Sequence, residues 1–510
     1  MRNLIIALFF LFYACPYLCA QSTFEVNGIT YSVIQEADGS TMYGTVCVTA
    51  CEKGDYEGEI VIPNGVKYEV DGYADQYKVI GIDDRAFKGN DMIVSVVLGA
   101  SIEFIERFAF DGCENLETVV IPMGNLTTIS ELAFYGSGIT RIEFPSSVRS
   151  IGMGAFMMCR NLESIILPTS LKSIGISAFS MCENLRNVVI PEDVSTLSTN
   201  VFGGCTSLES ITLPANLKSI EQSTFQNCKS LTEILLPEGL TKISDYAFYG
   251  CEKLSTISLP IKLTTIGSMA FMDCKSLTEI LLPEGLTKIS DHAFYGCEKL
   301  SAISLPIKLT TIGSMAFWGC EKLSAISLPS KLTTIERGTF MDCKSLTEIL
   351  LPEGLTKISD DAFRGCEKLS AISLPSKLTT IERGAFMDCK SLTEILLPEG
   401  LTKISDYAFQ GCEKLRSISF PAEVVSVGDS AFEDCVSLES VFLPPLLTSI
   451  SKYTFARCEK LENVSFPDSL KKIDENAFFR CTELRKVVIP EGTEVHEDAF
   501  RGCPLLEKIE

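Results

Sequence analysis

Apolar side chains recur along this chain in one fixed order, and that order repeats every 23 residues. One unit, read from Cys251, is CEKLSTISLPIKLTTIGSMAFMD, and the consensus is C-x-x-L-x-x-I-x-L-P-x-x-L-x-x-I-x-x-x-A-F-x-x. Proline keeps the period without a slip from Pro122 to Pro490. A fixed period in this range predicts stacked supersecondary units rather than one globular core.

Each unit, called a rung below, predicts the same local elements. In the rung that starts at Cys251, Leu254 and Ile257 indicate a short strand, which Pro260 ends because proline cannot donate to a neighbouring strand. A short helical turn with a Ser or Asp cap is then expected to carry Ala270 and Phe271 inward. The pattern predicts a repeat solenoid with short parallel strands on one face and turns and short helical turns on the other.

The first twenty residues follow a different pattern. A short positive start and an apolar run lead to Ala20, which is typical of a signal peptide over residues 1–20. The less favoured alternative is a lipoprotein signal that uses Cys15 or Cys19.

The rest of the chain divides into a cap and the repeat. Residues 21–78 lack the period and predict a small β-rich N-terminal cap with a hairpin at Asn27 and Gly28, placed to cover the open edge of the stack. At 23 residues a unit, residues 79–510 predict about nineteen rungs. Neighbouring strands lie about 4.8 Å apart, so these rungs would make a stack on the order of 90 Å long.

Charge and composition narrow the functional classes. The formal net charge is −22, which disfavours nucleic acid and anionic membrane surfaces as partners. Beyond the leader no segment is apolar enough to cross a membrane. Only His292 and His496 are histidines and no paired C-x-x-C motif occurs, so we expect no metal site. No cofactor motif is found either.

The cysteines predict an interior column of thiols. Fifteen of the 21 cysteines, from Cys159 to Cys481, keep the 23-residue spacing. Free cysteine is among the most buried residue types, so we favour unpaired interior thiols over disulfides. Cys47 and Cys51 lie in the cap, and the sequence leaves open whether they pair.

Two outward columns flank the buried isoleucine of each strand. The glutamate column runs Glu233, Thr256, Glu279, Ala302, Ala325, Glu348, Ala371 and Glu394, and the leucine column runs Leu235, Ser258, Leu281, Ser304, Ser327, Leu350, Ser373 and Leu396. Repeated apolar side chains that face water are typical of a surface that meets a partner. The candidate partner-binding residues are Glu233, Leu235, Thr256, Ser258, Glu279, Leu281, Glu348, Leu350, Glu394 and Leu396. The alternative is that this face is tolerated and binds nothing.

The unit resembles the BspA-like class of bacterial leucine-rich repeats. The matching features are L-x-x-I-x-L-P, the following L-x-x-I, and A-F-x-x-C at a 23-residue period, over roughly residues 79–510. The resemblance implies a secreted or surface-exposed protein that binds host matrix proteins, host cells or other bacteria.

These observations favour an exported, non-enzymatic interaction protein with a protein or glycan ligand. One alternative is a structural spacer of the envelope or periplasm without a specific ligand. A remote alternative is a carbohydrate hydrolase, because Glu233 and Glu279, two rungs apart, would lie about 9.6 Å from each other, within reach of an inverting pair. The sequence offers nothing that would make one of these repeated carboxylates an acid and the other a base.

Overall fold

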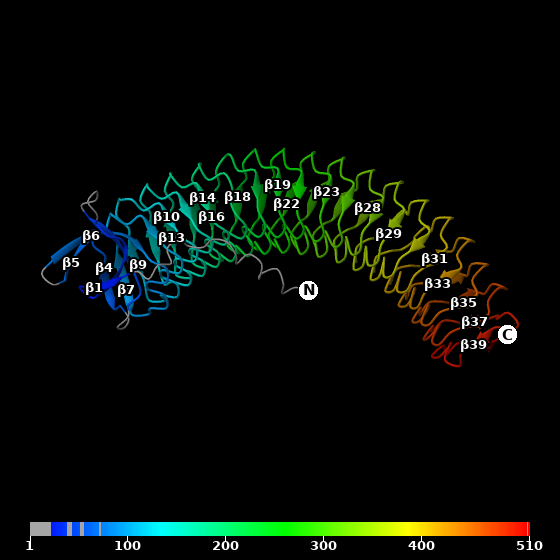
Figure 1. The fold of residues 1–510 in the computed structure, drawn as a ribbon. Coiled ribbons are helices and arrows are strands. Elements are labelled where there is room, and N and C mark those ends of the chain that lie inside the picture. Colours follow the sequence, from blue (N-terminus) through cyan, green and yellow to red (C-terminus); the bar gives the residue numbers. More distant parts are fainter. Residues whose placement is uncertain (1–21, 38–42, 52–55, 71–72, 507, 510) are drawn as a thin grey trace. The chain divides into compact units, whose positions relative to one another are not determined.

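The structure is a computed structural model that describes residues 22–37, 43–51, 56–70, 73–506 and 508–509. The predicted signal peptide, residues 1–20, lies outside the described residues. The chain divides into two units, Met1–Ala155 and Phe156–Glu510, called unit 1 and unit 2 below. In each unit the rungs follow one another in sequence order (Figure 1).

Unit 1 begins with a strand-rich segment. Its strands are β1 (Thr23–Val26), β2 (Ile29–Gln35), β3 (Gly44–Val48), β4 (Gly58–Val61), β5 (Gly65–Val70) and β6 (Tyr73–Ile82). The hairpin predicted at Asn27 and Gly28 is present, because β1 and β2 pair antiparallel up to Val26 and Ile29. Both turn residues have positive φ, at 53° and 78°, as a two-residue type I′ turn requires.

The first rungs continue the sheets of this segment. The remaining strands of unit 1 are β7 (Ile93–Val97), β8 (Phe104–Ile105), β9 (Thr118–Val120), β10 (Thr128–Ile129), β11 (Arg141–Glu143) and β12 (Ser150–Ile151). Strand β6 pairs parallel with β3 on one side and with β8 on the other, and β4 pairs parallel with β7. Since β6 crosses residue 78, the cap and the repeat share this strand.

Most rungs of unit 2 contribute two short strands, called the first and the second strand, and a few contribute only one of them. The first strands are β13 (Ser164–Ile166), β15 (Asn187–Val189), β16 (Ser210–Thr212), β18 (Glu233–Leu235), β20 (Thr256–Ser258), β22 (Glu279–Leu281), β24 (Ala302–Ser304), β26 (Ala325–Ser327), β28 (Glu348–Leu350), β32 (Ser417–Ser419), β34 (Ser440–Phe442), β36 (Asn463–Ser465), β38 (Lys486–Val487) and β40 (Lys508–Ile509). The second strands are β14 (Ser173–Ile174), β17 (Ser219–Ile220), β19 (Lys242–Ile243), β21 (Thr265–Ile266), β23 (Lys288–Ile289), β25 (Thr311–Ile312), β27 (Thr334–Ile335), β29 (Lys357–Ile358), β30 (Thr380–Ile381), β31 (Lys403–Ile404), β33 (Ser426–Val427), β35 (Ser449–Ile450), β37 (Lys472–Ile473) and β39 (Glu494–Val495).

The rungs pair parallel and in register. Ile234 pairs with Ile257 between first strands, and Ile243 pairs with Ile266 between second strands. Partners therefore lie 23 residues apart, and equivalent side chains of successive rungs form columns. The predicted solenoid of parallel strands is confirmed.

The predicted helical turns are not confirmed, because no described residue lies in a helix. Alternate backbone N–H groups of this segment bond to the next rung: Tyr246 N donates to Ser268 O (3.0 Å) and Phe248 N to Ala270 O (2.8 Å). The N–H groups in alternation with these bond within the rung, as Ala247 N donates to Ser244 O (3.4 Å) and Tyr249 N to Tyr246 O (3.1 Å). In a helix all of these N–H groups would bond to carbonyl groups of the same helix, whereas here half of them bond to carbonyl groups of the neighbouring rung.

The predicted Asp cap also acts between rungs. Asp245 Oδ1 accepts a hydrogen bond from the backbone N–H of Ser268 in the next rung, at 2.7 Å. Gly267 makes room for this contact, because a Cβ there would lie 2.4 Å from the same oxygen.

Stacked phenylalanines fill the centre of unit 2. The rings of Phe271 and Phe294 are parallel with centroids 5.5 Å apart, and those of Phe294 and Phe317 repeat this geometry. All three side chains are fully buried. No rung could bury its own ring, so this core exists only between neighbours.

Neighbouring rungs in the middle of unit 2 are of two complementary kinds, so the sequence repeats there in similar blocks of 46 residues, such as 228–273 and 274–319. Lys229 pairs with Glu252 at 3.0 Å, and Lys275 pairs with Glu298 at 3.4 Å, each pair joining successive rungs. These pairs are exposed and contribute little individually. Where the two kinds alternate, Lys and Glu rather than like charges are neighbours in this column.

A second complementarity involves glycine. Gly296 has a φ of +68°, and a Cβ on it would lie 2.4 Å from Oδ1 of Asp273 in the preceding rung. The same arrangement joins Asp342 to Gly365.

We therefore expect Gly296→Ala to lower the free energy of unfolding. The left-handed backbone alone costs about 1–2 kcal/mol for a residue with a Cβ, and the contact with Asp273 adds to that cost. Gly400→Ala is the matched control, because this glycine has neither positive φ nor an atom near the added Cβ. Urea denaturation of both variants measures the difference, and an equal midpoint for the two would contradict the role of Gly296.

Candidate interaction surface

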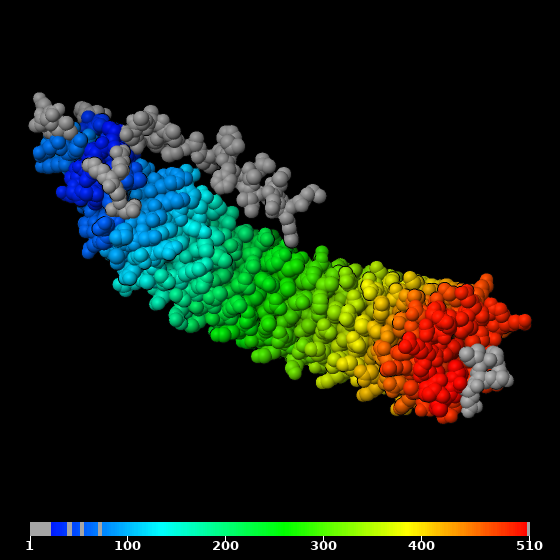
Figure 2. Space-filling model, turned by 90° about the horizontal axis from the view of Figure 1, so that it is seen from below, coloured from blue at the N-terminus to red at the C-terminus, as the bar shows by residue number. Residues whose placement is uncertain are grey.

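Alternation along the first strands produces one continuous exposed face in unit 2. The central Ile234 is 5% exposed, whereas Glu233 and Leu235 on either side point to solvent. Strands β20, β22, β24, β26 and β28 repeat this pattern. We call this surface, made of the glutamate and leucine columns, the first-strand face. The space-filling view shows the rungs of unit 2 side by side as one continuous surface (Figure 2).

Four leucines on this face are almost fully exposed. Leu235, Leu281, Leu350 and Leu396 are 82%, 73%, 79% and 78% exposed. The intervening positions of the column are serines, so the leucines do not cover one another. Exposing so much apolar surface in water is unfavourable, and repeated apolar side chains of this kind are typical of an interaction surface, which makes this face the candidate.

Part of the first-strand face forms an open groove of about 1120 Å³. It runs from Ser210 to Leu350, and its lining includes eight of the ten candidate residues: Glu233, Leu235, Thr256, Ser258, Glu279, Leu281, Glu348 and Leu350. Glu394 and Leu396 are outside that lining. Their segment is less regular, since Leu396 forms only isolated bridges with Ser373 and Ser419.

The groove carries negative charge only. Glu233, Glu279 and Glu348 line it, and no Lys, Arg or His does. Lysines stand instead on the second strands, as at Lys242 and Lys288. The carboxylates of the groove are thus not neutralised by cations of the lining.

The predicted column of interior thiols is confirmed by its burial. Cysteines from Cys159 to Cys481 are fully buried, and those from Cys182 to Cys481 are free thiols. The structure adds a role that the sequence did not show: the Cys205 thiol donates to the backbone carbonyl of Phe179, 26 residues earlier in the chain, at 3.1 Å. Burial raises the pKa of Cys205 to about 12, so this thiol stays protonated at neutral pH.

Cysteines outside the column differ in exposure. Cys47 is buried while Cys51 is partly exposed, and the structure shows both as free thiols. At the other end Cys503 is partly exposed, and hydrogen bonding with the Cys481 thiol lowers the pKa of Cys503.

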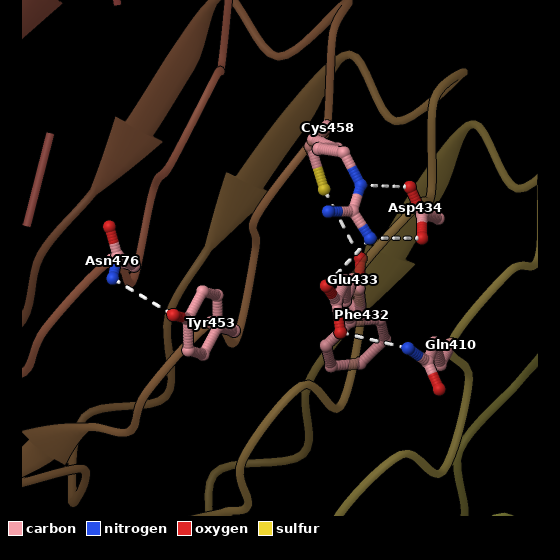
Figure 3. Close-up of polar contacts among 8 residues, drawn as sticks. Gln410, Phe432, Glu433, Asp434, Tyr453, Cys458 and Asn476 are labelled. Atoms are coloured by element: carbon pink, nitrogen blue, oxygen red, sulfur yellow. Dashed lines mark hydrogen bonds and ion pairs between the residues drawn. The ribbon is translucent and has the colours of Figure 1, made fainter. Parts of the chain in front are cut away.

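A charged cluster near the C-terminal end was missed from the sequence (Figure 3). Arg457 donates through Nε and Nη2 to the two carboxylate oxygens of Asp434, at 2.5 and 2.7 Å, and through Nη2 to Glu433 at 2.7 Å. Gln410 donates to Glu433 at 2.8 Å. Hydrogen bonding with Asp434 raises the pKa of Arg457. The cluster ties three successive rungs together, and its sequence signal was the pair of opposite charges 23 residues apart.

Neither histidine contributes to a metal centre in the described chain. The ring of His292 contacts Met315, with Nε2 3.1 Å from the sulfur, and His496 is exposed. Among the described residues no group of three His, Cys, Asp or Glu side chains is placed to hold a metal ion. In that same part of the chain, no helix has the length and apolar character needed to cross a bilayer.

A family model described as the BspA type leucine rich repeat region matches residues 80–209, 195–323, 264–393, 310–430 and 379–507. The chain belongs to this family. These matches span nearly the whole repeat, so the resemblance seen in the sequence is confirmed. A search of curated proteins found no match to this BspA-type chain.

Solved bacterial proteins are similar to this BspA-type chain along much of its length. A leucine-rich repeat protein from Bacteroides ovatus is 26% identical over 93% of this chain and 99% of its own, with a TM-score of 0.44. A leucine rich cell surface protein from Faecalibacterium prausnitzii is 28% identical over 74% of this chain and 95% of its own, with a TM-score of 0.45. The pneumococcal vaccine antigen PcpA is 18% identical over 93% of both chains, with a TM-score of 0.26.

The burial of the thiols predicts a sharp selectivity in alkylation. When the native protein is treated with iodoacetamide at mildly alkaline pH, we expect Cys51 and Cys503 to be modified first among the described cysteines. The column from Cys159 to Cys481 should react only after denaturation, as peptide mass spectrometry would show. Rapid native modification of Cys205 would contradict the interior column.

Proposed function

We propose that this BspA-type protein is an exported, non-catalytic binding protein, a surface adhesin or interaction protein, whose first-strand face holds a protein or glycan ligand. The observation that carries the proposal is the repeated exposure of Leu235, Leu281, Leu350 and Leu396 beside unneutralised carboxylates. Host matrix molecules, host cells and other bacteria are the partners that the family resemblance suggests.

The geometry of the face supports binding rather than catalysis. Glu233 and Glu279 are both exposed on repeated, equivalent strands. A hydrolase of the inverting kind needs one carboxyl group whose environment keeps it protonated, and equivalent exposed positions supply no such difference. A binding surface, in contrast, gains from repetition because each added rung adds the same contacts.

The first test replaces Leu235, Leu281, Leu350 and Leu396 by Ser in the purified protein. We expect saturable binding to a panel of host matrix proteins, host cells and partner bacteria to weaken about tenfold or more, because each leucine contributes about 1.5–3 kcal/mol when buried. Binding assays with labelled protein measure the change.

The matched control for this test replaces Ile261 and Ile307 by Ser. These side chains are 75% and 68% exposed, lie 46 residues apart like Leu235 and Leu281, and are outside the groove lining. Equal loss in both variants would move the site off the first-strand face. Absence of binding across the panel by the intact protein would favour a structural spacer.

Export has its own test. We expect the mature protein to begin at Gln21, and protease added to intact cells to degrade it, because the leader is removed and the repeat faces outside. N-terminal sequencing and immunoblotting measure the two results, with a cytoplasmic enzyme as the control for lysis. Degradation only after the envelope is opened would place the protein in the periplasm.

A further inference from the structure

The chemistry of the groove specifies its partner more closely than a protein or glycan. We infer that the first-strand face of unit 2 binds a basic amphipathic α-helix of another polypeptide. This inference rests on the proposed function and names the partner of the same face.

Charge gives the first part of the argument. The groove lining contains Glu233, Glu279 and Glu348 and no cationic side chain. Among the described residues none of these carboxylates has an ion-pair or hydrogen-bond partner. A ligand that carries Lys or Arg would supply the missing counter-charges, whereas an anionic ligand would be repelled.

The apolar side chains exclude a mainly polar ligand. Leu235, Leu281 and Leu350 project from the same groove, and the lining otherwise consists of Ile, Ala, Ser and Thr. No aromatic ring is present there for a sugar to stack on. The leucines instead favour aliphatic or aromatic side chains of a polypeptide, which would remove them from water.

Of the three groove leucines, only Leu235 and Leu281 are two rungs apart, since Leu350 lies three rungs beyond Leu281. The spacing of Leu235 and Leu281 favours a helix over an extended segment. Leu235 and Leu281 are two rungs apart, as are Glu233 and Glu279, and parallel strands lie about 4.8 Å apart, which gives about 9.6 Å. Residues seven apart on one face of a helix are separated by about 10.5 Å. An extended chain presents same-face residues about 6.7 or 13.4 Å apart, so it matches the two-rung step poorly.

The serine between two leucines provides the complementary space. Ser258 lies between Leu235 and Leu281 in the leucine column and leaves a notch there. A helix that places one residue over each leucine would direct the side chain three or four positions later into this notch. Lys or Arg beside the apolar stripe would then reach Glu233 and Glu279.

The test uses synthetic peptides of about 21 residues, three heptads long, as probes of the purified protein. The basic peptide is an alanine-rich helix with Leu every seventh residue and Lys beside each Leu. In the acidic peptide Glu replaces Lys, and in the broken peptide a central Pro interrupts the helix. Fluorescence anisotropy measures affinity, and circular dichroism measures helicity on binding.

We expect the basic peptide to bind and to gain helicity, and the acidic and broken peptides to bind about tenfold more weakly or less. Affinity should fall as salt rises from about 50 to about 500 mM, because screening weakens the charge pairs. Equal binding of the basic and acidic peptides, or of the basic and broken peptides, would overturn the inference.

Charge-reversed variants distinguish the contribution of the groove glutamates to peptide affinity from that of the protein's net charge. Replacing Glu233, Glu279 and Glu348 by Lys should weaken binding of the basic peptide about tenfold or more. Replacing Glu238, Glu284 and Glu353 by Lys changes the net charge equally at exposed turns of the same rungs, outside the groove lining, and should change affinity less than about twofold. Equal loss in the two variants would reveal general electrostatic attraction and overturn the inference.

Failure of this inference and failure of the proposed function give different results. If the four-leucine variant loses binding to a host or bacterial partner but no peptide binds, the face is functional and the helical, basic partner is wrong. If the basic peptide binds and the groove variant loses it, the inference is supported.

Discussion

Hydrogen bonds between successive rungs are the interaction on which the other features depend. Each rung leaves backbone N–H and C=O groups that only its neighbour can satisfy, as Tyr246 and Phe248 do with the rung that follows. Pairing must therefore stay in register, and every side chain meets its own equivalent above and below. A column is stable when its equivalent residues stack well, as Phe271 and Phe294 do, or when each side chain bonds to the backbone of another rung, as the Cys205 thiol does to the carbonyl of Phe179.

Features that depend on one rung could be predicted from the sequence. The strand around Ile234 and the outward direction of Glu233 and Leu235 follow from alternation, and the burial of the thiols follows from residue type and spacing. Features that depend on two rungs could not. The sequence of the segment around Tyr246 is typical of a helical turn, but half of its N–H groups donate hydrogen bonds to the next rung, which no single rung reveals. The extent of the groove likewise depends on how β16 to β28 stack.

The candidate surface differs from an enzyme site in kind. An active site gathers unlike residues whose environments differ, whereas this BspA-type face repeats the same two or three side chains at a constant step. Recognition on such a surface depends on the periodicity of the ligand as well as on its chemistry, and no single residue is expected to dominate. A unique cluster does occur around Arg457, but there the charged groups satisfy one another and hold rungs together.

The complementarity between alternate rungs bears on how the gene changes length. Duplication or deletion of 46 residues restores every contact between a Lys rung and a Glu rung, whereas a change of 23 residues brings two rungs of one kind together. The chain contains such a junction, where Glu298 is followed one rung later by Glu321. Each pairs away from the other, with Lys275 and Lys344. Gain or loss of rungs in pairs would thus preserve the Lys–Glu contacts, and the junction of Glu298 and Glu321 shows how the fold accommodates two neighbouring rungs of one kind.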